Sequence, residues 1–81
     1  MWHEMAILLK KEKYDSAVAI AEKLLDFYRE RSKINCAQLL QIIVEAAEKK
    51  GDEERIEKYK TELEWLLKDK YIKSYLKRKS Y

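Results

Sequence analysis

The sequence contains no proline and only one glycine, Gly51. β-Rich folds use these two residues at many of their turns and bulges, so their scarcity argues against a sheet. The abundant residues are instead Ala, Leu, Glu and Lys, which are among the strongest helix formers. We therefore predict an all-α protein.

Cysteine and long apolar runs are also scarce. The lone Cys36 cannot form a disulfide within the chain, and an unpaired thiol suits a reducing compartment. No apolar run approaches the roughly 20 residues that a membrane span requires. The first residues, MWHEMAILLKKEK, place their lysines after the apolar stretch, which is the reverse of the order in a secretory signal. These features predict a cytoplasmic protein without a membrane partner.

Side chains that could support catalysis do not form a recognisable set. His3 and Glu4 begin like the HExxH zinc motif, but Ile7 occupies the position of the second histidine. The carboxylates fall mainly at expected helix starts and on polar faces, where they pair with lysine and arginine, and no glycine-rich loop is present to hold a phosphate. We expect no enzyme activity, and hence no catalytic residue, metal, cofactor or small-molecule substrate.

At 81 residues the chain has the length of one small domain, residues 1–81. Apolar residues recur at three- and four-residue steps and predict helices over about residues 2–12, 15–31, 34–49 and 53–78. Asp15 suits the start of the second helix, Ser32 or Asn35 the start of the third, and Asp52 the start of the fourth. Gly51 suits a left-handed residue that ends the third helix. Apolar residues cover more than one face of the third helix, which predicts that it lies between neighbours.

The fourth helix is predicted to be long because no glycine, proline or turn cluster follows Leu67. Ile72 and Leu76 continue the apolar stripe that begins at Ile56. At about 1.5 Å per residue, a helix over residues 53–78 would extend beyond the helices that pack against it. Residues 68–81 have a net charge of +5, so we expect a basic helical extension at the end of the chain.

Short connections should place successive helices antiparallel, which gives two consecutive helical hairpins. The two hairpins align with a constant offset of 39 residues, which pairs Ala17 with Ile56 and Leu24 with Leu63. An offset of this size is typical of helical repeat proteins.

Two segments connect this pattern to a known family. Residues 49–55, KKGDEER, and residues 12–17, EKYDSA, resemble the turn and following helix of a tetratricopeptide-like repeat of extended length. The resemblance covers residues 1–66 and implies paired antiparallel helices. The first turn lacks the glycine of the family, the second lacks its tyrosine, and the closing proline is absent. An unrelated antiparallel four-helix bundle or a three-helix domain is the alternative.

Six tyrosines and two tryptophans are many for so small a core, so some should contact a partner. Phe27, Tyr28, Tyr59 and Trp65 occur at helical spacing, which is more typical of core residues than of a ligand site. Trp65 lies to one side of its stripe, however, and the basic extension continues with further apolar residues. The residues that we expect to bind a partner are Trp65, Tyr71, Ile72, Tyr75 and Leu76.

The basic extension has three interpretations. It can be only the soluble end of a helix, it can bind another protein, or it can bind nucleic acid through phosphate contacts and base stacking. The cations that would contact nucleic acid or an acidic partner are Lys70, Lys73, Lys77, Arg78 and Lys79. The sequence favours a small helical adaptor that binds a protein partner or its own copy as a homodimer. Nucleic-acid binding is the alternative function.

Overall fold

The computed structural model describes residues 1–78, with side chains as far as Leu76. Within this range the chain is helical and contains no strand, which confirms the all-α class predicted from composition. The helices are α1 (Trp2–Lys10), α2 (Tyr14–Tyr28), α3 (Lys33–Lys50), α4 (Glu53–Leu66) and α5 (Lys70–Arg78). None of these helices has the length and apolar character that crossing a membrane requires.

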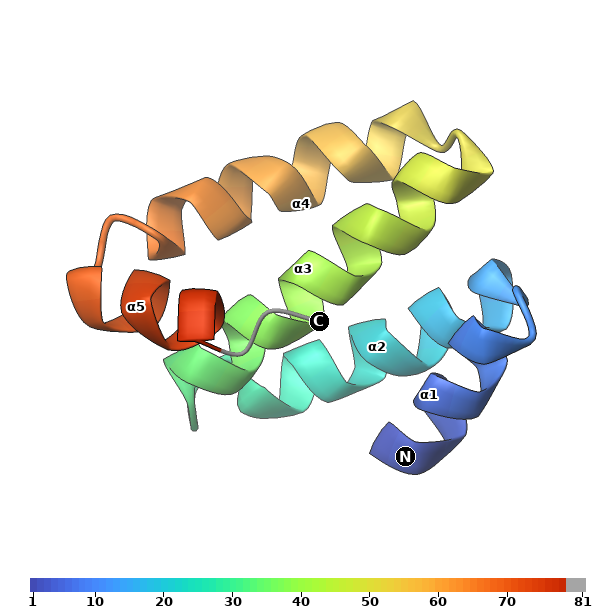
Figure 1. Cartoon of the computed structure of the whole chain (residues 1–81), viewed down its shortest axis with the longest axis horizontal. Coiled ribbons are helices and arrows are strands. Elements are labelled where there is room, and N and C mark those ends of the chain that lie inside the picture. The colour runs from blue at the N-terminus through green and yellow to red at the C-terminus, as the bar shows by residue number, and fades with distance from the viewer. Residues whose placement is uncertain (79–81) are drawn as a thin grey trace.

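The central element is α3. Helices α2 and α4 pack along it, α5 lies against it, and α1 packs on α2 (Figure 1). Buried residues lie on more than one face of α3, as the sequence predicted for a helix between neighbours. They are Cys36, Ala37, Leu39, Leu40, Ile43, Val44, Ala46 and Ala47.

Three helix ends form as the sequence predicted. Ser32 caps α3 by accepting a hydrogen bond from the backbone N–H of Asn35 at 3.3 Å. Gly51 ends α3 with φ +81°, a conformation that costs glycine little because it has no Cβ. Asp52 caps α4 by accepting from the N–H of Arg55 at 3.2 Å.

The start of α2 differs from the prediction. The helix begins at Tyr14, and the expected cap Asp15 lies within its first turn. The carboxylate of Asp15 instead accepts a hydrogen bond from Lys50 at the end of α3. A negative charge in the first turn still favours the helix through its dipole. The sequence pattern located this helix start to within one residue and assigned its side chain the wrong partner.

The prediction of one continuous helix over residues 53–78 was wrong. A turn at residues 67–69 separates α4 from α5, and α5 folds back onto α3 instead of extending beyond the body (Figure 1). The described residues therefore form five helices instead of the four expected. Two effects favour the turn. Ile72 becomes buried with only 3% of its surface exposed, and Asp69 accepts a hydrogen bond from the N–H of Tyr71 at 2.9 Å.

Candidate functional site

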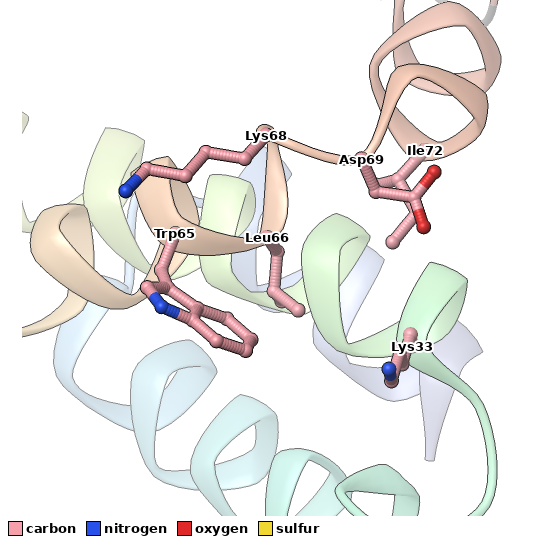
Figure 2. A pocket seen from close by; sticks show the side chains of 6 residues that line it. All are labelled: Lys33, Trp65, Leu66, Lys68, Asp69 and Ile72. Atoms are coloured by element: carbon pink, nitrogen blue, oxygen red, sulfur yellow. The ribbon is translucent and has the colours of Figure 1, made fainter.

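A hollow opens on the surface where the end of α4, the α4–α5 turn and the start of α3 meet (Figure 2). Its volume is about 320 Å³. The lining combines apolar and charged side chains: Lys33, Trp65, Leu66, Lys68, Asp69 and Ile72. We refer to these six residues as the Trp65 hollow.

The apolar side of the hollow is built by two helices. Trp65 and Leu66 occupy the last turn of α4, where Figure 2 shows their side chains next to each other. Leu66 is partly buried and packs against the core, whereas Trp65 is 67% exposed. Ile72 contributes a third apolar surface from α5. The hollow thus has a buried apolar base and an exposed indole at its edge.

The charged side of the hollow is mainly positive. Lys33 at the start of α3 and Lys68 in the turn are both exposed. Asp69 is the acidic residue of the lining, and one of its oxygens already accepts the hydrogen bond from Tyr71. Two further exposed lysines, Lys70 and Lys73, follow on α5. The lining of the hollow itself therefore has two ammonium groups and one carboxylate.

The structure divides the residues that the sequence predicted as partner contacts. Trp65 and Ile72 both line the Trp65 hollow, but Ile72 belongs to its buried base. Tyr71 is 69% exposed, and together with Lys70, Ser74 and Tyr75 it lines a separate hollow of about 340 Å³. Leu76 is partly buried. The single exposed apolar strip expected over residues 71–76 was wrong, because α5 buries part of it.

The predicted cations also differ in what the structure describes. Lys70 and Lys73 are exposed on α5. Lys79 lies outside the described residues, as do the side chains of Lys77 and Arg78. Lys33 was not predicted as a neighbour of Trp65, and Lys68 was predicted only as part of the basic extension. Lys33 is far from Trp65 along the chain, so no local spacing could have indicated that the two share a surface.

The expected core aromatics separate into buried and exposed residues. Tyr59 is buried, which confirms its prediction, and Tyr28 is partly buried beside Trp2. Phe27 is 51% exposed, and the Arg31 guanidinium lies over its ring at 4.2 Å from the centroid. The assignment of Phe27 and Trp65 to the core was therefore wrong. Helical spacing placed Phe27 near an apolar stripe but did not show that it lies at the edge, whereas Trp65 was already expected to one side of its stripe.

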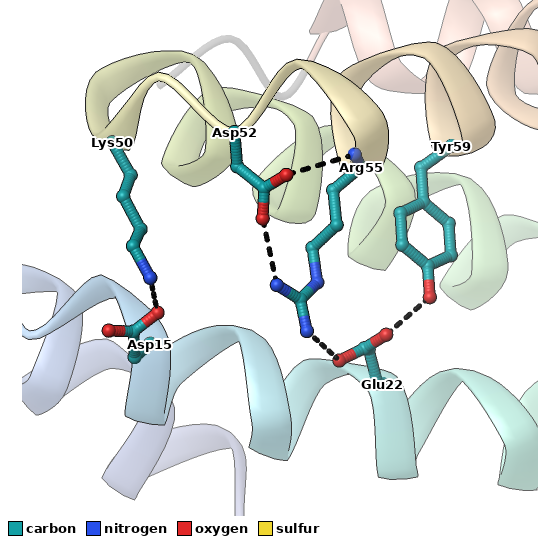
Figure 3. A network of polar contacts seen from close by, with 6 residues as sticks. All are labelled: Asp15, Glu22, Lys50, Asp52, Arg55 and Tyr59. Atoms are coloured by element: carbon teal, nitrogen blue, oxygen red, sulfur yellow. Dashed lines mark hydrogen bonds and ion pairs between the residues drawn. The ribbon is translucent and has the colours of Figure 1, made fainter.

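Apart from the two hollows, a polar cluster connects α2 to α4 and to the turn before α4 (Figure 3). The Tyr59 hydroxyl donates to Glu22, and Arg55 forms an ion pair with the other oxygen of Glu22 at 3.5 Å. Arg55 also donates to Asp52 at 2.8 Å. Because every acceptor in this cluster already has a partner on the protein, we interpret it as a structural connection between helices.

The electrostatics of this cluster follow from its contacts. Burial, assisted by the hydrogen bond to Glu22, raises the pKa of Tyr59 to about 12. The hydrogen bond from Arg55 lowers the pKa of the Asp52 carboxyl. Elsewhere, burial raises the pKa of the Cys36 thiol, as expected for a small buried residue on α3. Residues 1–78 contain no group of three or more His, Cys, Asp or Glu side chains arranged to hold a metal ion.

Comparison with protein-family models, with curated proteins and with solved structures finds no match to this chain.

Proposed function

We propose that this protein is a small tetratricopeptide-like helical adaptor that binds an acidic segment of a partner protein at the Trp65 hollow. The observation that carries the proposal is the 67% exposed indole of Trp65, which stands beside a hollow with a positive rim. The experiment that tests it is a binding measurement with charged peptides, described below.

The apolar part of the hollow suits a side chain of a partner protein. Tryptophan is enriched among the residues that contribute most to protein interfaces, because it has a large apolar surface and one polar N–H. The volume of about 320 Å³ lies at the small end of the roughly 300–1,000 Å³ range of ligand pockets. It can accept an apolar side chain, with the indole covering that side chain from one edge.

The charges around the hollow determine the chemistry of the segment. Lys33 and Lys68 line it, and Lys70 and Lys73 are exposed on the adjoining helix. Carboxylates on either side of the inserted apolar residue could form ion pairs with these ammonium groups. Exposed pairs of this kind add little affinity each, but they accelerate association and select against basic partners.

Synthetic peptides test this proposal directly. One peptide has a central phenylalanine between glutamates, and a matched peptide has lysines in place of the glutamates. Isothermal titration should show saturable binding of the acidic peptide that weakens as salt increases, and weaker binding of the basic one. Trp65→Ala should abolish binding, whereas Phe27→Ala removes another exposed aromatic residue and should leave it unchanged. Equal binding of both peptides, or binding that persists in Trp65→Ala, would refute the proposal.

Nucleic-acid binding is the second candidate function, supported by a different part of α5. Tyr71 is 69% exposed, and Lys70 and Lys73 are exposed on the same helix. This segment therefore offers an aromatic ring for base stacking together with cations for phosphates. The charge of the rest of the chain opposes it, since residues 1–67 have a net charge of −2. Binding to single-stranded RNA and duplex DNA across a salt series tests it. Each phosphate contact would make the logarithm of the binding constant fall by about 0.7 to 0.9 per log unit of salt concentration. No binding at low salt excludes this function.

A further inference from the structure

Helix α5 depends on α3 for its stability. It has nine residues, which is too short for a stable isolated helix in water. Its contacts with the body are made with α3, where Ile72 is buried to 3% exposure. The apolar surface of α3 that Ile72 covers must in turn be covered by a helix of this kind. An α5 from any copy of the chain satisfies both requirements equally.

The turn between α4 and α5 is close to helical already. Leu67 has φ −70° and ψ −7°, and its N–H still donates to Leu63 as in a helix. The next two N–H groups, of Lys68 and Asp69, donate to residues three positions earlier instead of four. No glycine or proline occupies residues 67–70. Residues 67–70 can therefore adopt helical dihedrals, which would join the two helices.

Joining the helices would move α5 away from its own α3, and this is why a second copy is required. A straight helix through residue 78 carries Ile72 beyond the end of its own body, where it would be exposed. Two straightened copies can place each α5 on the α3 of the other and remake the same Ile72 contacts twice. Exchange of an identical element in this way is a low-cost route to a dimer, and short connecting turns favour it.

We propose that this chain forms a homodimer by exchanging α5, with α4 and α5 joined into one helix in each copy. The site of self-association is the surface of α3 that Ile72 covers in the monomer. The proposal does not depend on the acidic-segment binding described above, because it uses α3 and Ile72 as its contacts and does not require Trp65.

A proline at residue 70 separates the two forms. Lys70 is the first residue of α5, where proline is favoured because the N–H at that position has no partner within the helix. In a joined helix the same proline would be internal, where it removes a hydrogen bond and clashes with the carbonyl of residue 66. Lys70→Pro should therefore preserve the monomer and prevent exchange. Lys70→Ala removes the same charge and is the matched control.

Sedimentation velocity from micromolar to millimolar protein measures the outcome. The unmodified chain and Lys70→Ala should form a dimer as concentration rises, and the dimer of Lys70→Pro should be weaker by more than about a hundredfold. Circular dichroism of Lys70→Pro checks that the monomer keeps its helices. Asp69→Ala removes the cap of α5 and should tighten the dimer by about tenfold.

Specific results overturn the proposal. It fails if the unmodified chain remains monomeric at millimolar concentration, if Lys70→Pro dimerises as well as Lys70→Ala, or if Asp69→Ala does not tighten the dimer. Trp65→Ala should leave the dimer intact while abolishing peptide binding, so a failure of exchange is distinguishable from a failure of the adaptor function.

Discussion

Glu12, in the turn between α1 and α2, has φ +61° and is the non-glycine residue with positive φ in the described part of the chain. A residue with a Cβ loses roughly 1–2 kcal/mol in this conformation, because the Cβ approaches the following carbonyl. The corresponding turn between α3 and α4 uses Gly51, which avoids the cost. The turn between α1 and α2 is therefore strained at Glu12, whereas the turn between α3 and α4 avoids this strain at Gly51.

We predict that Glu12→Gly increases the free energy of unfolding by up to about 1 kcal/mol, with the gain reduced by the greater freedom of glycine in the unfolded chain. Urea denaturation monitored by circular dichroism measures this. Glu12→Ala keeps the Cβ and removes the same charge, so it should show no such gain. A Glu12→Gly variant no more stable than Glu12→Ala would contradict the prediction.

Ionisation of Tyr59 makes the stability of the folded protein depend on pH in the alkaline range. Its pKa is raised from 10 to about 12 in the folded protein, so the unfolded chain loses this proton first as pH increases. The stabilising contribution is complete below pH 10 and is lost as pH rises from about 10 to about 12. We predict that Tyr59→Phe weakens this loss of stability and costs about 1 kcal/mol at neutral pH, where the hydrogen bond to Glu22 is removed.

Two measurements check the Tyr59 prediction. Chemical denaturation between pH 8 and pH 12 should give a steeper fall of stability in the unmodified chain than in Tyr59→Phe. Ultraviolet titration of tyrosinate should lose its component near pH 12 in the variant. Identical pH profiles for the two proteins would show that Tyr59 does not carry this dependence.

At the scale of the elements, α3 contributes more buried residues to the core than any other described helix, because it lies between α2 and α4 and also holds α5. Its position between other helices can be predicted from the sequence, since apolar residues cover more than one of its faces. The end of α3 at Gly51 and the start of α4 at Asp52 were predicted correctly, and Ser32 was one of two caps predicted for the start of α3, because capping depends on residues within one turn of the chain.

We predict that Ile43→Ala on α3 lowers the free energy of unfolding by about 2–5 kcal/mol, because Ile43 is fully buried at 0% exposure and truncation leaves a cavity. Ile7→Ala on α1 is the matched control, since Ile7 is 41% exposed and should cost far less. Guanidinium denaturation of both variants measures the difference. Similar losses for the two would show that the core does not centre on α3.

At the scale of the whole molecule, α5 completes the cover of α3 and forms one side of the Trp65 hollow. The polar cluster around Glu22 and the ion pair between Arg29 and Glu62 at 3.2 Å connect α2 with α4 beside that core. Fold and candidate site therefore depend on the same arrangement of α3, α4 and α5.

Removal of residues 69–81 tests this dependence. We predict a loss of about 1.5–3 kcal/mol of stability and a lower melting temperature, because the α3 surface under Ile72 becomes exposed. A helix end that extends from the body without contacting it would leave the melting temperature unchanged. Removal of residues 79–81 alone keeps α5 and serves as the control. Calorimetry at one low protein concentration avoids any contribution from dimerisation.

The sequence by itself determined the helical class, the position of α3 and the helix ends at Gly51 and Asp52, and it limited the cap of α3 to Ser32 or Asn35. These features depend on propensity, periodicity and capping, which act over a few neighbouring residues. It also placed Trp65 to the side of its apolar stripe, and the structure shows this residue 67% exposed.

Only the tertiary structure decided where the last segment lies. Residues 67–69 contain no glycine or proline, so their sequence permits a straight helix, although Asp69 can also cap a new one. The burial of Ile72 against α3 favours the turn, and this contact joins residues far apart in the chain. The same packing brings Lys33 to Trp65 and creates a hollow that no spacing in the sequence could show.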